Sequence, residues 1–359
     1  MNILIGYAYH PRTTATYLQR ALERRATTTF VGTPWEGRPG FGATDDICPL
    51  VAALVEPPSL YLHVDAGGVR YFPRGLTNLA CPTACYLIDV HVGPKERLKQ
   101  AMFFDYAFSA QRDFVATLRA AGHPQAHWLP LAADPTVHRP YDVPKRYDIA
   151  FVGATGPGYE RRHALLARLA QRFTLNDYTR SYTPDAMARV YSEGRLGFNC
   201  SIRREVNMRL FEGPATGTAL LTDHIDNGLS ALMTDSEHVV LYDDDTLFEQ
   251  VEELLHDTER RERIARQGYA HVHAHHTYDH RVATLLDTVF GAGTGPRLEA
   301  PLRRRPDPAV ALAYAEIYSR SLKVDDTIDE FKRVPLRWRY RLPAAKQVVF
   351  SLIRRVKYG

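Results

Sequence analysis

Arg209 and Glu212 are the residues whose types and spacing most clearly indicate chemistry. They stand three apart in "RLFEGPATGTALLTD", on a stretch with a helical pattern, and so share one helical face. Asn207 precedes them, where its side chain could cap the helix, and Gly217 follows, where the helix would end before a buried strand. Such a helix could offer Arg209 to a diphosphate and let Glu212 accept both hydroxyls of a ribose. The alternative is a surface ion pair, worth roughly 0.3 kcal/mol.

A second candidate anion site is the turn in "YDIAFVGATGPGYERR". Gly153, Gly156 and Gly158 follow a predicted strand and would let backbone N–H groups approach a ligand where the next helix begins. Their spacing differs from the dinucleotide-binding pattern, so a plain strand-to-helix turn is the alternative. Arg161 and Arg162 in the first helical turn oppose the helix dipole, which a bound anion or a nearby carboxylate would compensate.

Candidate catalytic residues follow predicted strands in the first half of the chain. His10 comes after the first strand, and Asp89 and His91 stand in "LIDVHVG". A hydroxyl nucleophile needs a base, and a histidine oriented by an aspartate is the usual arrangement. If the strand continues through Asp89 and His91, their side chains point to the same face. Solvated loop histidines are the alternative for His10 and His91.

Strands that are apolar throughout alternate with helical patterns along most of the chain. The strands are expected near 2–9, 60–65, 84–90, 106–110, 127–132, 147–152, 195–199, 218–222 and 238–242. This order predicts an α/β protein with two doubly wound Rossmann-like domains that face a cleft. The predicted parts are a first Rossmann-like domain 1–134, a proline-rich linker 135–147, a second Rossmann-like domain 148–290 and a basic helical extension 291–359.

Several of these segments, taken in order, resemble a known fold family. "YDIAFVG…ERRHALLARL", "GFNCSI", "NMRLFEGPATGTALLTDHIDNGLSAL", "HVVLYDDDTLFEQVEELLHD" and "HHTYDHRVATLL" resemble the C-terminal domain of GT-B glycosyltransferases. Within that fold they resemble the family-1-like group that includes the CgeB spore-maturation proteins. The resemblance covers about 148 to 290 well and the first domain more loosely.

The resemblance implies a nucleotide-sugar donor held mainly by the second domain. Glu212 corresponds to the ribose-binding second glutamate of an E-x7-E element, whereas the first glutamate falls at Arg204, with Glu205 one place off. The donor-binding residues are then expected to be Gly153, Asn207, Arg209, Glu212 and Gly217, and the catalytic candidates His10, Asp89 and His91.

The predicted activity is a hexosyltransferase-type reaction from a nucleotide-diphosphate sugar to an unidentified acceptor. We expect it to be retaining. We also expect it to be metal-independent, because arginines and helix N-termini can neutralise the leaving diphosphate in place of a cation. No cofactor beyond the nucleotide-sugar co-substrate is expected. Two alternatives stay open: a non-catalytic sugar-nucleotide-binding or scaffold protein, and a nucleotide-sugar epimerase on the same fold.

Composition narrows the class of protein. The hydrophobic fraction of 45% and the charged fraction of 24% are those of a globular protein, and no uncharged apolar run reaches the roughly 18 residues of a membrane span. Four scattered cysteines favour a reduced, cytoplasmic protein. The histidines of "AHVHAHHTYDH" lack a zinc-site pattern, so no metal site is expected there.

The charge of the chain is concentrated at its end. From Lys332 onward there are nine Lys and Arg and no acid, which leaves 36 basic against 41 acidic residues before it. A generally basic, nucleic-acid-binding surface is therefore not expected. "PAAKQVVFSLIRRVKYG" is basic and amphipathic, so peripheral attachment at the inner face of a membrane is one reading. Packing on the first domain or in a homodimer is the other.

Overall fold

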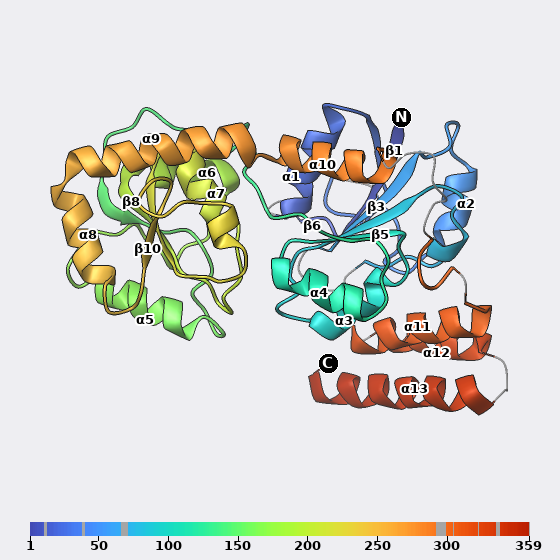
Figure 1. The fold of residues 1–359 in the computed structure, drawn as a ribbon. Coiled ribbons are helices and arrows are strands. Elements are labelled where there is room, and N and C mark those ends of the chain that lie inside the picture. The colour runs from blue at the N-terminus through green and yellow to red at the C-terminus, as the bar shows by residue number, and fades with distance from the viewer. Residues whose placement is uncertain are drawn as a thin grey trace. The chain divides into compact units, whose positions relative to one another are not determined.

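The computed structural model describes residues 1–10, 13–37, 40–65, 71–291, 299–303, 305–321, 323–334 and 338–358, except the side chains of 338, 339 and 358. The chain forms two compact units (Figure 1). Unit 1 comprises Met1–Ala110, Phe114–Leu129 and Leu286–Gly359, and unit 2 comprises Gln111–Asp113 and Pro130–Leu285. The segment predicted as a linker thus lies within unit 2, and the predicted extension is part of unit 1.

Unit 1 is built on a six-stranded, fully parallel sheet. Its strands are β1 (Asn2–Gly6), β2 (Thr27–Phe30), β3 (Leu60–Asp65), β4 (Thr83–Leu87), β5 (Tyr106–Ser109) and β6 (Ala126–Trp128), in the order β2-β1-β3-β4-β5-β6. β1, β3, β4 and β5 are buried along their whole length, as strands covered on both faces must be. The direction of winding reverses between β1 and β3, where sheets of this type usually bind ligands.

Helices of ordinary amphipathic design cover the unit 1 sheet. They are α1 (Thr14–Glu23), α2 (Ile47–Ala52), η1 (Leu76–Asn78), α3 (Pro94–Ala101) and α4 (Arg112–Ala120). In α1, Ala15, Leu18 and Leu22 recur at helical spacing and are fully buried, while the Thr13 hydroxyl caps the helix by accepting the Ala15 N–H.

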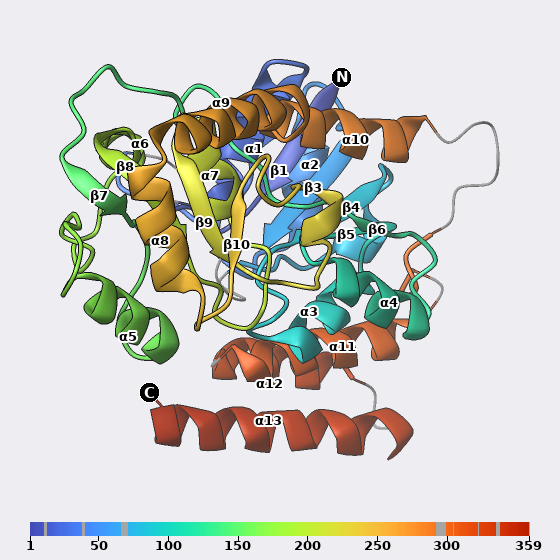
Figure 2. The same cartoon turned by 60° about the vertical axis from the view of Figure 1, so that its left-hand side comes forward.

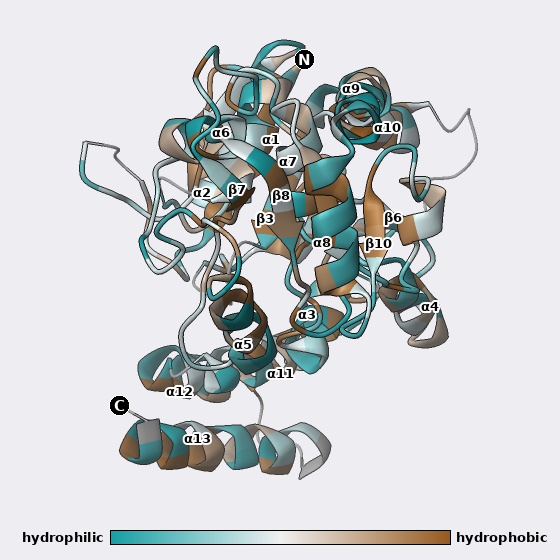
Figure 3. Cartoon of the chain, turned by 90° about the vertical axis from the view of Figure 1, so that its left-hand side faces the viewer, coloured by the Kyte–Doolittle hydropathy of each residue, from teal (hydrophilic) through white to brown (hydrophobic). Residues whose placement is uncertain are grey.

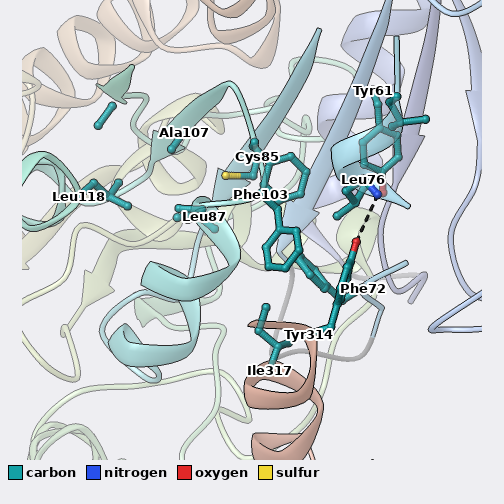
Figure 4. Packing of buried hydrophobic residues seen from close by; sticks show 14 of the residues in the cluster. Tyr61, Phe72, Leu76, Cys85, Leu87, Phe103, Ala107, Leu118, Tyr314 and Ile317 are labelled. Carbon is teal, nitrogen blue, oxygen red and sulfur yellow. Dashed lines mark hydrogen bonds between the residues drawn. The ribbon is translucent and has the colours of Figure 1, made fainter. Parts of the chain in front are cut away.

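The C-terminal segment completes the core of unit 1. It forms α11 (Asp307–Arg320), α12 (Val324–Arg333) and α13 (Trp338–Tyr358). Tyr314, Ile317 and Tyr318 of α11 belong to the main core cluster (Figure 4). The Tyr314 hydroxyl accepts the Leu76 N–H at 3.2 Å, and the Tyr318 hydroxyl donates to the Phe72 carbonyl at 2.9 Å. The hydroxyls thereby satisfy backbone groups that would otherwise be buried without partners.

A buried ion pair also joins this segment to the rest of unit 1. Arg74, which follows β3 in the chain, donates to Glu330 and, at 3.1 Å, to Asp326, both on α12. Glu330 is 1% exposed, so removing Arg74 would leave a buried carboxylate without its main partner.

Unit 2 contains a four-stranded parallel sheet. Its strands are β7 (Tyr147–Ala150), β8 (Gly194–Asn199), β9 (Ala219–Asp223) and β10 (Val240–Tyr242), in the order β10-β9-β8-β7. The helices are α5 (Glu160–Leu169), α6 (Pro184–Glu193), α7 (Arg209–Ala215), η2 (Leu229–Ala231), α8 (Leu247–His256), α9 (Thr258–His275) and α10 (Tyr278–Phe290), whose last turn belongs to unit 1. Figure 2 shows the same elements from a second direction.

The length and hydropathy of the helices show whether any of them could span a membrane. Within the described ranges, none of the helices is both long and apolar enough to cross a bilayer.

Candidate functional site

Arg209 is held at the carboxyl edge of the unit 2 sheet. It is the first residue of α7, and its Nε donates to Asn199 Oδ1 at 2.8 Å, where β8 ends. Asn199 is itself fixed, because its Nδ2 donates to Thr222 Oγ1 at 2.9 Å on β9. The guanidinium carbon lies 5.3 Å from the centroid of the Phe151 ring. These contacts fix the orientation of the guanidinium without neutralising its charge.

The turn after β7 brings Gly153 against Arg209. A Cβ atom at Gly153 would lie 2.6 Å from Arg209 Nη1 and 2.9 Å from the Phe151 ring. No side chain larger than hydrogen fits there while the arginine stays in place. The structure therefore brings together two of the predicted donor-site residues, Gly153 and Arg209, and gives a steric reason for the glycine.

Arg162 adds a second positive charge to this edge. Its Nε and Nη2 donate to the Cys200 carbonyl at 3.0 and 2.7 Å, and its Nη1 donates to the Ala154 carbonyl at 2.9 Å. Burial, and next the neighbouring charge of Arg209, lower the pKa of Arg162 to about 10. Within the described part of the chain, neither guanidinium forms an ion pair with a carboxylate. A bound anion would relieve the repulsion between them.

Arg161 has a different role from Arg162. It donates to Asp223 at 3.0 Å and to Asp244 at 2.6 Å. The sequence predicted that either a bound anion or a nearby carboxylate would compensate the positive charge of the arginines in this helical turn. For Arg161, two carboxylates do so.

Glu212 is a nearly buried carboxylate without a hydrogen bond to any described residue. It is 7% exposed, and its Oε1 lies 3.7 Å from His138 Nε2. His138 Nδ1 accepts the Asp134 N–H at 2.9 Å, so a neutral imidazole carries its proton on Nε2, the nitrogen that faces Glu212. Burial raises the pKa of Glu212 to about 7, against the opposing effect of the Arg209 charge. The two residues form no ion pair, which contradicts the surface-pair alternative.

The raised pKa of Glu212 predicts a specific pH dependence of stability. A carboxyl whose pKa is higher in the folded state stabilises the protein below its unfolded pKa, and this contribution is lost as pH rises towards the folded pKa. From about pH 4.5 to about pH 7 the loss should total about 3 kcal/mol. Urea unfolding at several pH values, compared with Glu212→Gln, measures it. The same slope in both proteins would contradict the assignment to Glu212.

Asn207 does not cap α7, contrary to expectation. The cap position is Met208, which is itself helical and has no side-chain capping bond. The Asn207 side chain instead has both amide atoms buried without a hydrogen-bond partner among the described residues. Such a group normally finds a partner in a ligand or an ordered water. Asn207 precedes Arg209 by two residues in the chain.

Gly217 lies away from the other predicted donor-site residues. It precedes β9, whereas Asn199 and Arg209 meet near the carboxyl end of the sheet, where Asn199 pairs with Thr222. Gly217 has φ of 72°, which ends α7, and it lines a groove of about 390 Å³ with Pro140 and Tyr269. The sequence pattern correctly predicted that a helix ends at Gly217. It did not show that this helix end lies at the amino edge of the sheet. Gly217 therefore lies at the opposite end of β9 from the residues that surround Arg209.

The loop before α7 offers no unengaged carboxylate at the E-x7-E position. Arg204 has φ of 60° and pairs with Asp226 at 2.9 Å on the surface. The buried Glu205 carboxylate accepts the N–H groups of Ile202 and Arg203 at 2.9 and 2.7 Å. Glu205 therefore stabilises the loop. The chain differs from the E-x7-E motif in the contacts of this carboxylate as well as in its position in the sequence.

The catalytic candidates belong to unit 1. β4 ends at Leu87, and the Val92 N–H bonds to the Asp89 carbonyl at 3.0 Å, so Asp89 and His91 lie in a turn. The argument that strand alternation points both side chains one way is therefore wrong. The His10 ring lies 5.5 Å from that of Trp35, which is 45% exposed. Catalytic roles for His10, Asp89 and His91 stay predictions.

Asp65 and Arg97 form a buried pair where β3 ends. Arg97 Nε and Nη2 donate to the two Asp65 oxygens at 2.7 and 3.3 Å. Sequence reasoning passed over Arg97, since "PKERLKQ" has the composition of a surface helix. Burial raises the pKa of Asp65 although Arg97 opposes the shift.

The histidine-rich segment is engaged in ordinary hydrogen bonds. His271 and His276 each approach the Leu232 carbonyl, at 2.8 and 3.0 Å, and Arg281 lies 2.9 Å from His276 Nδ1. Burial is the main cause that lowers the pKa of His276 to about 3. In the part of the chain that the structure describes, no three residues of the metal-ligating types converge.

Two contributors to the site were missed in the sequence. His138 stands in the segment interpreted as a linker, and Phe151 was counted as a core strand residue. Phe151 directly follows β7, and it was the last residue but one of the predicted strand. This position was the only signal that Phe151 lies at the carboxyl edge of the sheet. His138 gives no comparable local signal.

Comparison with known proteins supports the fold. Residues 139–287 match a family model described as glycosyl transferase-like. No curated protein sequence matches the chain. Among solved structures, the Anabaena protein HepE in complex with UDP-glucose aligns at 12% identity over 80% of this chain and 100% of its own, with a TM-score of 0.57.

Two other solved structures align over similar lengths. An alpha-glucosyltransferase solved with UDP and a 13-mer DNA has 12% identity and a TM-score of 0.55 over 80% of this chain and 99% of its own. Sucrose-phosphate synthase from Thermosynechococcus elongatus has 12% identity and a TM-score of 0.51 over 82% and 100%. The narrower likeness to the CgeB group stays a prediction. The protein therefore has the GT-B fold of glycosyltransferases, and most of its second unit matches the glycosyl transferase-like family.

Proposed function

We propose that this protein transfers a sugar from a nucleoside diphosphate sugar to an acceptor hydroxyl, with the donor held by unit 2. The observation that carries the proposal is the Glu212 carboxylate, which is buried without a hydrogen bond from any described residue and feels the charge of Arg209, whose guanidinium forms no ion pair within the described ranges. A buried carboxylate of this kind is costly unless a ligand supplies hydrogen-bond donors. The family match and the GT-B fold support the same reading.

Each residue has a proposed role towards the donor. Glu212 accepts hydrogen bonds from the two ribose hydroxyls, and Arg209, with Arg162 beside it, binds the diphosphate. The Asn207 amide, which lacks a hydrogen-bond partner among the described residues, bonds to the donor in this proposal, and Gly153 leaves room for Arg209. None of these roles requires a cofactor, and the paired guanidinium charges supply the positive charge that the leaving group needs.

The reaction breaks the bond between the sugar's anomeric carbon and the diphosphate oxygen. The electron pair of that bond goes to the oxygen of the nucleoside diphosphate, whose growing charge Arg209 stabilises. The acceptor hydroxyl oxygen bonds to the anomeric carbon and loses its proton to a base, for which His10, Asp89 and His91 stay the candidates. Retention of configuration also stays a prediction, tested by NMR of the product's anomeric signal.

Uridine is the first base to test. The HepE and alpha-glucosyltransferase structures named above contain UDP or UDP-glucose. We therefore expect UDP to bind more tightly than GDP, ADP or dTDP in calorimetric titrations without added metal. Glu212→Ala should weaken binding of that nucleotide by about 10- to 150-fold, because one charged hydrogen-bonding group is lost.

A matched control separates the ribose role from general effects on folding. Glu193 is also nearly buried, but it stands beside the start of β8, at the opposite edge of the unit 2 sheet. Glu193→Ala should leave nucleotide affinity unchanged. If Glu212→Ala bound UDP as tightly as the unaltered protein, the ribose assignment would be withdrawn.

The products from the donor alone distinguish the remaining alternatives. Slow hydrolysis of the bound donor to free sugar supports a transferase, whereas an epimeric nucleotide sugar would identify an epimerase. Binding without any turnover, with or without acceptor mixtures, would favour the scaffold reading.

A further inference from the structure

The outer face of α13 carries an apolar stripe that no other described element covers. The stripe consists of Leu342, Val349, Ile353 and Val356, at helical spacing, and all four are exposed. Val356 is 90% and Ile353 59% exposed. Phe350 and Leu352 widen the stripe and are exposed as well. An apolar surface of this shape on a helix is a recognised mark of an interaction site.

The opposite face of α13 is already used within unit 1. Ala344 and Ser351 are fully buried, and α13 packs against α11 and α12. Gln347 accepts a hydrogen bond from Ser319 of α11 at 3.0 Å. Both cartoon views place α13 as the outermost layer of unit 1, with α11 and α12 between it and the sheet (Figures 1 and 2). The stripe therefore faces away from the core that the rest of the unit provides.

The helix that carries the stripe is strongly cationic. It contains Arg339, Arg341, Lys346, Arg354, Arg355 and Lys357 and no acidic residue. Three acidic residues of α11 and α12 are paired with residues outside α13: Glu316 with Lys99, and Asp326 and Glu330 with Arg74. Apolar and polar bands alternate along α13 in the hydropathy colouring (Figure 3). The surface thus combines exposed apolar side chains with a high density of positive charge.

A groove with the same dual character opens near the C-terminal end of α13. It has a volume of about 410 Å³ and is lined by Phe350, Ile353, Arg354 and Lys357. The guanidinium carbons of Arg354 and Arg320 lie 5.7 and 5.9 Å from the centroid of the Phe350 ring. Its lining therefore places two apolar side chains directly beside two cationic ones.

We propose that α13 is the docking surface of this protein for an anionic lipid bilayer. The apolar stripe would enter the boundary between headgroups and acyl chains, while Lys346, Arg355 and Lys357 contact lipid phosphates. A second copy of the chain is a poorer occupant, because pairing two α13 helices across a two-fold axis would bring like charges together. The proposal concerns unit 1 and is independent of the donor site.

Sedimentation of the full chain with lipid vesicles tests the proposal. We expect binding to vesicles of phosphatidylglycerol and phosphatidylcholine, and little binding to phosphatidylcholine alone. The double variant Ile353→Asp/Val356→Asp should bind the anionic vesicles at least about 30-fold more weakly, since it loses apolar burial and adds repulsion. Raising the salt concentration should weaken binding of the unaltered protein.

The matched control is Val55→Asp, which makes the same kind of change at a fully exposed valine of unit 1 outside α13. It should bind vesicles as the unaltered protein does, and equal thermal unfolding of all variants shows that the fold is intact. Three results would overturn the proposal: no binding to anionic vesicles, equal binding to neutral ones, or unchanged binding by the double variant. A lipid-free dimer that the double variant dissociates would likewise overturn it, in favour of a second copy.

Discussion

Arg209→Ala is expected to lower the rate of donor cleavage by about 100- to 1,000-fold, the usual cost of removing one preorganised group that stabilises charge on a reacting oxygen. Arg209 is suited to this role because Asn199 fixes its orientation and none of the described carboxylates forms an ion pair with it. The measurement is hydrolysis of UDP-glucose without acceptor. Uridine affinity should change little, whereas UDP affinity should fall, since only UDP carries the phosphates that Arg209 contacts.

Two further variants control this experiment. Arg209→Lys keeps the charge but loses the forked geometry, so it should recover part of the rate. Arg189→Ala removes an exposed arginine of the same unit that pairs with Glu193 at 3.5 Å, and it should leave the rate unchanged. Equal losses of uridine and UDP affinity in Arg209→Ala would argue against a phosphate role.

Tyr314→Ala should lower the free energy of unfolding by about 3–5 kcal/mol, as large-to-small changes at buried aromatic positions do. The Tyr314 ring lies 4.4 Å from that of Phe103, centroid to centroid, and 5.7 Å from that of Tyr318. Its hydroxyl also accepts the Leu76 N–H, which would lose its partner. Urea unfolding followed by circular dichroism measures the change.

The loss of unfolding free energy in Tyr314→Ala tests whether α11 is part of the unit 1 core or only packs on its surface. Tyr314→Phe should cost only about 1 kcal/mol, because it keeps the ring and loses one hydrogen bond. Tyr269→Ala, at a more exposed tyrosine of unit 2, should stay within about 0.5 kcal/mol of the unaltered protein. If Tyr314→Ala behaved like Tyr269→Ala, α11 would not be part of the unit 1 core.

Apolar periodicity predicted the two parallel sheets well, because strands buried on both faces leave a continuous signal. "LYLHVD" gives β3 with the predicted bounds, and "YAFSA" gives β5 to within one residue. β2 was not predicted, since "TTTF" has no apolar run and its residues are only partly buried. Local pattern also does not show that α11 fills the core of a sheet some 200 residues earlier in the chain.

Sequence reasoning selected residues that one short segment holds together, and it missed contacts made between segments far apart in the chain. Arg209 and Glu212 belong to a single turn of α7, so their spacing was sufficient to select them. The approach of His138 to Glu212, and the effect of the Arg209 charge on Arg162, depend on how segments far apart in the chain pack. Gly217 shows that proximity in sequence can also mislead. It was grouped with Arg209 because the two are close in the chain, but they lie at opposite ends of α7.

The division of the chain has a consequence for synthesis. Unit 2 is an insertion, because unit 1 is interrupted at Leu129 and resumes only at Leu286. The core of unit 1 needs Tyr314, Ile317 and Tyr318, which are made only after the whole of unit 2. At about 5–20 residues per second, the roughly 190 residues between Leu129 and Tyr318 take about 10–40 seconds to make. During that interval unit 2 is complete first, while the apolar surface that α11 will cover stays open to chaperones and to aggregation.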